Sequence, residues 1–318
     1  MDSQAIDSFA APGRTAKVSV IIPCYRQSHL LADAIKSVLQ QTHKHYEVLV
    51  VDDGSPDNVV EVAMCYPNIR IVRQRNQGLA AARNSGFRHS NGEFLVFLDA
   101  DDRLTPECLS IGLEEFTAHP DCAMISGHWR YIRMDGARED DFAQRPLEGE
   151  PYLTLLERNY VGMNAAVMIR RGAFEAVGGF DISLASCEDY ELYMRLARAY
   201  PVFSHGMIVA EYRRYDQSMT KQPCVMMQGL LGVFAAQLPL IRGNAAYLKA
   251  FRRGLYLNSK VAYWPALGAA KRALKRGNLM AALLRARTIA RRPMLLLRAY
   301  SLAKQAGREL RRCRDASA

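Results

Sequence analysis

Three aspartates lie within four consecutive residues, directly after an apolar run. Residues 94–98 (FLVFL) could form a strand buried on both faces, and Asp99, Asp101 and Asp102 follow it. A carboxylate that leaves water needs a compensating partner, and carboxylate oxygens are ligands that Mg²⁺ and Mn²⁺ prefer. We therefore expect these aspartates to bind a divalent cation. The alternative is a polar strand end that faces solvent.

Strands and helices alternate in the part of the chain that carries these aspartates. Apolar runs predict strands at residues 17–22, 46–51, 69–72 and 93–98. Helical spacing of apolar residues predicts helices at 28–41, 78–90 and 106–118, and a further helix that ends at about residue 65. Such alternation is typical of an α/β fold with a mostly parallel sheet flanked by helices. Beyond residue 120 the pattern weakens, with strands expected at 122–126 and 165–169 and helices at 186–199 and from 223 onward.

Polar residues follow the first, second and fourth predicted strands. Ligands of parallel sheets gather at the carboxyl ends of the strands, so we expect these residues to form one site. Pro23 and Tyr25 end the first strand, and Asp52 and Asp53 end the second. Tyr25 could stack on a nucleobase, and either aspartate could accept a hydrogen bond from the base or ribose. Alternatively, Tyr25 packs and the aspartates only form a turn.

Three further charged residues are candidates. Arg83 could contact a phosphate from the helix at 78–90, or it could be a solvated helical arginine. Glu188 and Asp189 stand at the start of a predicted helix, whose N-terminus is expected to lower the pKa of either acid. One of them could deprotonate an acceptor hydroxyl. Alternatively, residues 186–189 form a capping box and Asp189 is structural.

Taken together, these motifs resemble family 2 glycosyltransferases with the Rossmann-like GT-A fold. The matching stretches are Val20 to Tyr25, Val50 to Ser55, Asn76 to Gly78, Ala82 to Asn84, Asp99 to Asp102, Arg170-Arg171 with Phe174, Gly178 to Asp181, and Glu188-Asp189. The resemblance covers roughly residues 17–220, and a joint match in order and spacing is more specific than any single motif.

The resemblance implies an inverting hexosyltransferase-type enzyme that uses a nucleotide sugar, often a UDP-sugar, and Mg²⁺ or Mn²⁺. It assigns Tyr25, and either Asp52 or Asp53, to binding of the nucleobase, with Pro23 in the same binding site. It assigns Arg83 to binding of the nucleotide. It further assigns Asp101, with Asp99 or Asp102, to ribose and metal, Asp189 to the general base beside Glu188, and residues 178–181 to the acceptor side. The expected acceptor is a hydroxyl of a glycan or lipid-linked saccharide, as in bacterial surface polysaccharide synthesis.

One position departs from the family pattern. Many relatives place a histidine a few residues after a Tyr-Arg pair near the end of the catalytic domain, where it approaches the metal or diphosphate. Here Tyr212, Arg213 and Arg214 are followed by Tyr215. Because a tyrosine is a poor Mg²⁺ ligand, the cation would depend on aspartates, phosphates and water, or the arginines would neutralise part of the charge.

Positive charge is concentrated at the end of the chain. The net charge is +10, yet residues 242–318 carry 19 Lys or Arg against two acids. We expect a loose start at 1–16, a catalytic domain at 17–222 and a basic helical region at 223–318. The basic helices could lie on an anionic membrane, or present a solvated face or contact the acidic catalytic part.

Composition also bears on location and on rival functions. The seven cysteines form no C-x-x-C pair, which favours a reducing compartment, and residues 1–17 lack an apolar core. We therefore expect a cytoplasmic protein without a signal peptide. The basic tail could attach it peripherally to the inner face of the membrane. A nucleotidyltransferase lacks support because no Gly-rich, Lys-bearing loop follows the first strand. A nucleic-acid-binding protein is the other alternative, although no such motif occurs and the carboxylates would repel phosphate.

Overall fold

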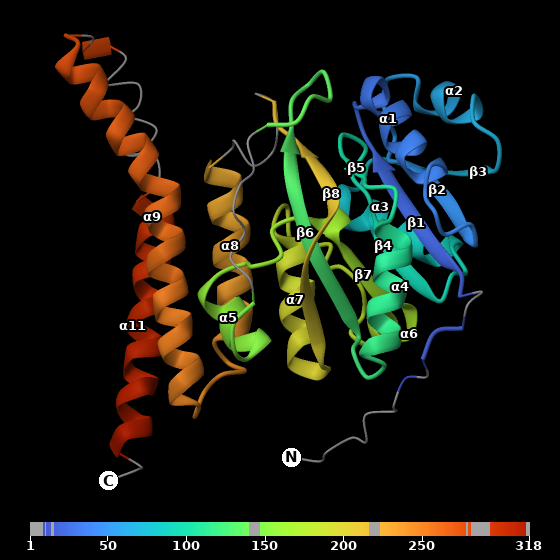
Figure 1. Ribbon diagram of the computed structural model, residues 1–318. Coiled ribbons are helices and arrows are strands. Elements are labelled where there is room, and N and C mark those ends of the chain that lie inside the picture. Colours follow the sequence, from blue (N-terminus) through green and yellow to red (C-terminus); the bar gives the residue numbers. More distant parts are fainter. Residues whose placement is uncertain are drawn as a thin grey trace. The chain divides into compact units, whose positions relative to one another are not determined.

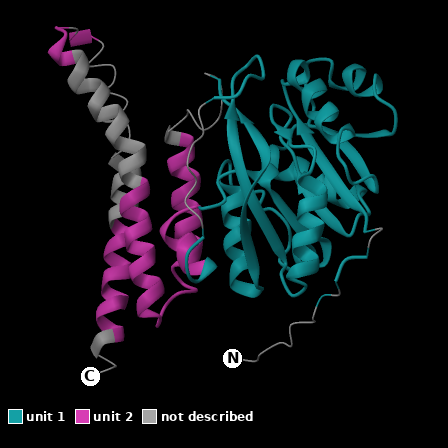
Figure 2. Ribbon diagram, viewed as in Figure 1, with its two compact units in different colours: residues 1–151, 160–216 teal, residues 152–159, 217–318 magenta. Residues whose placement is uncertain are grey.

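The structure is a computed structural model that describes residues 9, 11–13, 16–139, 147–215, 223–277, 279–280 and 293–315. The expected loose segment 1–16 therefore lies mostly outside the described residues. The chain forms two compact units, residues 1–151 with 160–216 and residues 152–159 with 217–318 (Figure 2). No helix in the described ranges is long and apolar enough to cross a membrane.

The first unit is built on one sheet of eight strands in the order β3-β2-β1-β4-β7-β6-β8-β5 (Figure 1). The strands are β1 (Val18–Cys24), β2 (Tyr46–Asp52), β3 (Ile69–Arg73), β4 (Phe94–Phe97), β5 (Arg103–Leu104), β6 (Met124–Ile132), β7 (Val167–Arg170) and β8 (Val202–Arg213). Strands β1 to β4 pair in parallel, and β6 pairs in parallel with β8. Only β7 and β5 run against their neighbours, so the predicted α/β fold with a mostly parallel sheet is confirmed.

Helices flank this sheet. They are α1 (Ser28–Leu39), α2 (Val59–Met64), α3 (Leu79–His89), α4 (Cys108–Ala118), α6 (Arg171–Ala176) and α7 (Glu188–Ala199), with a 3-10 turn η1 (Asn164–Ala166). Strands β1 and β4 are buried along their whole length, which explains their continuous apolar sequences. Helix α3 packs closely on β1, since a Cβ on Gly86 would lie 2.3 Å from a methyl carbon of Ile21.

The sheet differs from the sequence expectation after residue 120. Strand β6 runs to Ile132, beyond the expected end at 126, and β8 was not expected. The β6–β8 ladder shifts register near His128, and β8 mixes exposed and buried residues. Because such irregular pairing breaks the period-two alternation of a strand, the sequence gives no clear strand pattern there.

The second unit is helical in its described part. It contains α5 (Pro151–Glu157) except its first residue, α8 (Pro223–Gln237), α9 (Ala245–Lys275) and α11 (Pro293–Asp315). The Tyr152 hydroxyl donates to Gln237 Oε1 at 2.8 Å, and the rings of Phe234 and Phe251 lie 5.1 Å apart. Residues 152–159 thus pack with the C-terminal helices although 160–216 belong to the sheet unit.

Candidate active site

The carboxyl ends of β1, β2 and β4 lie together, as predicted. Cys24 at the end of β1 pairs with Asp52 at the end of β2, and Ile21 pairs with Phe97 of β4. Pro23 is buried within β1, whereas Tyr25 follows it and is 39% exposed. The Tyr25 ring is therefore accessible at the edge where the polar clusters meet, as stacking on a planar ligand requires.

Asp52 and Asp53 are both buried and both bind neighbouring loops. Asp52 accepts from the Ser55 backbone N–H at 2.8 Å and from Arg73 Nε at 3.1 Å. Asp53 accepts from the backbone N–H groups of Gln77 and Gly78, each at 2.9 Å, and so holds the start of α3. These carboxylates position the loops after β2 and β3, and their contact with a base stays a prediction.

Arg83 joins two of the predicted acidic groups. Its guanidinium is 2% exposed and binds Asp99 Oδ1 through Nη2 and Glu188 Oε1 through Nη1, both at 2.6 Å. Burial lowers the pKa of Arg83, but the charges of Asp99, Glu188 and Asp189 outweigh burial and raise it. The sequence alternative of a solvated helical arginine is wrong, because Arg83 faces inward from α3 between α7 and the turn after β4.

Asp101 and Asp102 have different surroundings although they are adjacent. Asp101 is partly buried and accepts from the Tyr215 hydroxyl at 2.7 Å, and burial followed by the charge of Asp99 raises its pKa. Asp102 is 3% exposed and accepts from the Arg213 backbone N–H at 2.8 Å. Burial and then its two acidic neighbours raise the pKa of Asp102 well above its usual range, which favours a neutral carboxyl group.

Asp189 occupies the first turn of α7 and is partly buried. Burial and the adjacent charge of Glu188 raise its pKa to about 6, against the lowering effect of Arg83. The sequence expectation of a pKa lowered by the helix N-terminus is therefore wrong, because desolvation and like charge are the larger effects. A carboxylate with a pKa near neutrality is well matched to accept a proton.

The start of α7 differs from the capping box considered as an alternative, because the N-cap residue is Cys187 and not Ser186. The helix begins at Glu188 after Cys187, whose φ of 63° lies in the left-handed region and whose side chain makes no capping hydrogen bond to the helix. The Asp189 carboxylate instead accepts from the backbone N–H of Tyr190 at 2.7 Å. A non-glycine residue in this conformation carries strain, and here it immediately precedes the two acids.

Two asparagines of the site, Asn164 and Asn84, were given no role in the sequence analysis, although Asn84 lies in a stretch that matches the family. With its amide oriented to satisfy both neighbours, Asn164 accepts from Arg83 Nε at 3.0 Å and donates to the Tyr193 hydroxyl at 2.8 Å. Asn84 holds the predicted acceptor turn, because its side chain exchanges two hydrogen bonds with the Phe180 backbone, at 2.8 and 2.9 Å. An isolated asparagine has no local pattern that distinguishes a structural contact from a turn.

The arginines considered as charge-neutralising groups are bound within the protein. Arg213 is 1% exposed and donates to Asp33 Oδ2 at 2.9 Å, to the Asp101 carbonyl at 2.8 Å and to the Met134 carbonyl at 2.7 Å. Arg214 is exposed and lies 3.3 Å from a carboxylate oxygen of Glu139. Arg213 therefore fixes the end of β8 and has few donors left for a ligand.

Among the described side chains, the carboxylates after β4 form only part of a ligand set for a divalent cation. Among residues whose side chains the structure describes, no group of three or more His, Cys, Asp or Glu is arranged as a complete metal site. Asp99 and Asp101 are close enough for the charge of one to raise the pKa of the other. A divalent cation would relieve that repulsion, so this pair fits such an ion if a ligand supplies further oxygens.

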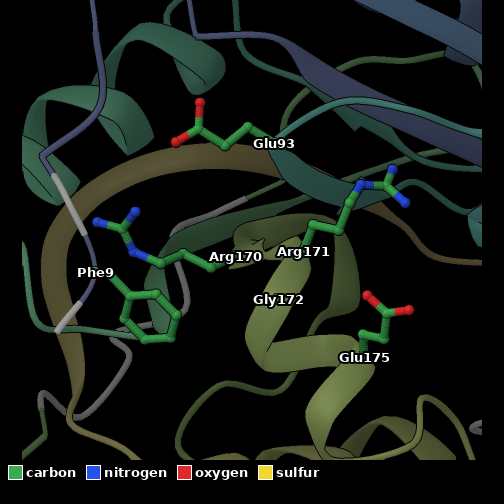
Figure 3. A pocket seen from close by; sticks show the side chains of 6 residues that line it. All are labelled: Phe9, Glu93, Arg170, Arg171, Gly172 and Glu175. Carbon is green, nitrogen blue, oxygen red and sulfur yellow. The ribbon is translucent and has the colours of Figure 1, made fainter. Parts of the chain in front are cut away.

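A separate pocket lies among residues at the opposite ends of these strands (Figure 3). Its walls include Phe9, Glu93, Arg170, Arg171 and Glu175. The guanidinium groups of Arg170 and Arg171 point in different directions and bind protein oxygens, among them the Cys122 carbonyl and Ser90 Oγ. This pocket contains none of the predicted site residues, and its arginines are engaged in holding the fold.

Comparisons with known proteins agree with this geometry. The family described as glycosyl transferase family 2 matches residues 19–178, half of the chain. An uncharacterized glycosyltransferase of Haemophilus influenzae is 31% identical over 56% of this chain, and the chain spans 61% of that relative. A putative teichuronic acid biosynthesis glycosyltransferase, TuaG of Bacillus subtilis, is 29% identical over 64% of this chain and 81% of its own length.

Solved structures show the same fold. The mannosyltransferase PcManGT of Pyrobaculum calidifontis, in complex with GDP-Man and Mn²⁺, has a TM-score of 0.61 at 20% identity and covers 95% of this chain and 89% of its own. S. aureus TarS 1-349 in complex with UDP-GlcNAc has a TM-score of 0.56 at 14% identity, covering 86% of this chain and 92% of its own. The fold is thus of the GT-A type that the sequence predicted. The chain belongs to glycosyl transferase family 2.

Proposed function

We propose that this enzyme transfers a sugar from a nucleotide sugar, with a UDP-sugar as the first candidate, to a hydroxyl of a glycan or lipid-linked saccharide with inversion at the anomeric carbon. One observation carries the proposal. Arg83 binds Asp99 on the turn after β4 and Glu188 at the start of α7, next to the proposed base Asp189, and these two contacts support a single site. Single-displacement transfer needs a base opposite the departing diphosphate.

Each residue would have a separate task in this reaction. Tyr25 would stack on the base, which Asp52 or Asp53 would orient. Asp189 would accept the proton of the acceptor hydroxyl, and its raised pKa favours that step. Arg83 would keep Glu188 and Asp99 in place, since both of its terminal nitrogens already bind carboxylates.

A divalent cation is part of the proposal. Asp99 and Asp101 would hold it together with oxygens of the donor diphosphate. Bound there, Mg²⁺ or Mn²⁺ would neutralise the charge that develops on the leaving group. Asp102 is less suited to this task, because it is buried against the Arg213 backbone.

The acceptor proposal rests on similarity to enzymes of polysaccharide synthesis. One relative is named for teichuronic acid biosynthesis and another, of Escherichia coli, is chondroitin synthase, 28% identical over 60% of this chain and 28% of its own length. We propose an acceptor of this class, a cytoplasmic location, and contact of the C-terminal helices with an anionic membrane surface. The exposed basic pairs Arg252-Arg253 and Lys275-Arg276 support the last point.

A donor screen with the full-length protein tests the proposed reaction. UDP-, GDP- and other nucleotide sugars would be compared for thermal stabilisation and hydrolysis, each with Mg²⁺ or Mn²⁺ and with chelator. We expect one nucleotide to stabilise the protein only when cation is present. The anomeric configuration of the transferred sugar then tests inversion, and a product that retains the donor configuration would contradict the assignment of Asp189 as sole base.

A further inference from the structure

The Tyr215 hydroxyl lies between two polar side chains at the predicted donor side. It donates to Asp101 Oδ2 at 2.7 Å and accepts from Gln27 Nε2 at 2.9 Å. Gln27 precedes α1, Asp101 follows β4, and Tyr215 stands two residues after β8. A single phenol therefore connects the loops after β1, β4 and β8 at the carboxylate that the proposed function assigns to the cation.

Arg213, two residues before Tyr215, binds the end of β8 to the aspartates after β4. The Arg213 backbone N–H donates to Asp102 Oδ1, and Arg213 Nε donates to the Asp101 carbonyl, both at 2.8 Å. The turn at Asp101 and Asp102 and the end of β8 are thus bound to each other independently of the Tyr215 hydroxyl.

The hydrogen bonds give the phenol a defined direction. A tyrosine hydroxyl has one proton and can accept, so a donor from Gln27 on one side favours donation to Asp101 on the other. A carboxylate has about four lone-pair positions, so the Asp101 carboxylate keeps acceptor capacity beyond its bond to Tyr215. Hydrogen-bonded carboxylates of this kind have a fixed orientation toward their other ligands.

We propose that Tyr215, held by Gln27, is a positioning residue that orients the Asp101 carboxylate for the cation and the donor diphosphate. The inference rests on the proposed function and extends it to a residue outside the predicted site set. Tyr215 contacts the carboxylate and not the reacting atoms. The competing explanation is that the phenol only anchors the end of β8, and it predicts a loss of stability without any change in cation affinity.

Cation affinity, measured apart from turnover, tests this inference. Mn²⁺ binding would be followed by electron paramagnetic resonance on the full chain in the presence of UDP and, in parallel, GDP. Variants Tyr215→Phe and Gln27→Leu remove the hydroxyl and its orienting donor, and Tyr66→Phe, at a partly buried tyrosine two residues after the end of α2, is the matched control. Thermal unfolding without ligand reports on the anchoring role.

We expect Tyr215→Phe to weaken nucleotide-dependent Mn²⁺ binding on the order of 10-fold or more, the usual loss when a ligand's outer hydrogen bond is removed. Gln27→Leu should weaken it less, and Tyr66→Phe should leave it unchanged. Unchanged or tighter Mn²⁺ binding by Tyr215→Phe would overturn this inference but not the proposed cation site, whatever the unfolding temperature of the variant. A wild-type protein that binds no Mn²⁺ with either nucleotide would overturn both the inference and the proposed cation site.

Discussion

Arg83 Nη1 lies 2.6 Å from Glu188 Oε1, and this ion pair joins α3 to α7 across 105 residues of sequence. Both side chains are buried, and the same guanidinium also binds Asp99. The charge of Arg83 therefore offsets a cluster of acids that would otherwise repel one another. The site depends on this arginine for its assembly as well as for its electrostatics.

Replacing Arg83 by methionine should strongly destabilise the protein. The change leaves Glu188 and Asp99 without their shared cation, and removing one partner of a buried ion pair costs about 3–5 kcal/mol. Chemical denaturation measures the loss. Arg88→Met, at an exposed position of the same helix, is the control and should stay within about 0.5 kcal/mol of wild type. A small effect at Arg83 would show that the acids are not held by it.

Replacing Asp189 by asparagine should abolish transfer and leave donor binding nearly intact. In the wild type, the rate should fall as pH decreases through about 6, because the base then becomes protonated. Single-turnover rates and donor affinity, measured across this pH range, separate the two effects. Unchanged turnover would remove Asp189 from the role of base.

The same substitution should change the pH dependence of stability. The pKa of Asp189 rises from 3.8 to about 6 on folding, so the folded state binds a proton between these values. This group therefore lowers the free energy of unfolding as pH rises from about 4 to about 6. Asp189→Asn should raise the unfolding temperature at pH 7.5 but not at pH 4. Asp121→Asn, at an exposed position, should show no such difference.

The aspartates after β4 should differ in cation binding. Asp101→Asn should weaken nucleotide-dependent Mn²⁺ binding by more than the roughly 10-fold loss expected for an outer partner. Asp102→Asn should leave it unchanged, because this side chain is buried and an amide oxygen can still accept from the Arg213 N–H. Isothermal titration of Mn²⁺ with UDP present distinguishes them. Equal losses would make Asp102 a ligand as well.

The basic C-terminal helices should carry any membrane contact. Replacing the exposed pairs Arg252-Arg253, Lys275-Arg276 and Arg311-Arg312 by glutamine should reduce flotation of the full chain with vesicles that contain anionic lipid. Vesicles of neutral lipid are the control. Equal flotation of the wild type and the glutamine variant would exclude these residues as the anchor. Loss of wild-type flotation at high salt would support an electrostatic contact.

Much of the fold and of the site follows from local patterns in the sequence. The apolar runs of β1, β2 and β4 are continuous because these strands are buried, and short connections between them require parallel pairing with helices outside. Parallel strands end at the same edge, so residues 23–25, 52–53 and 99–102 had to meet there. Strand β8 was not predicted, because its irregular pairing with β6 removes the alternation of apolar and polar residues that is typical of a strand.

Only the tertiary structure decided how the charged groups are paired. Sequence alone assigned Arg83 to a nucleotide or to solvent, and the fold buries it between acids from two distant segments. The tertiary structure also decided the pKa of Asp189. Burial and the charge of Glu188 raise this pKa, and they outweigh the lowering effect of the helix N-terminus, which the sequence predicted. Local spacing determines which backbone elements form, whereas burial and the approach of remote charges depend on how those elements pack.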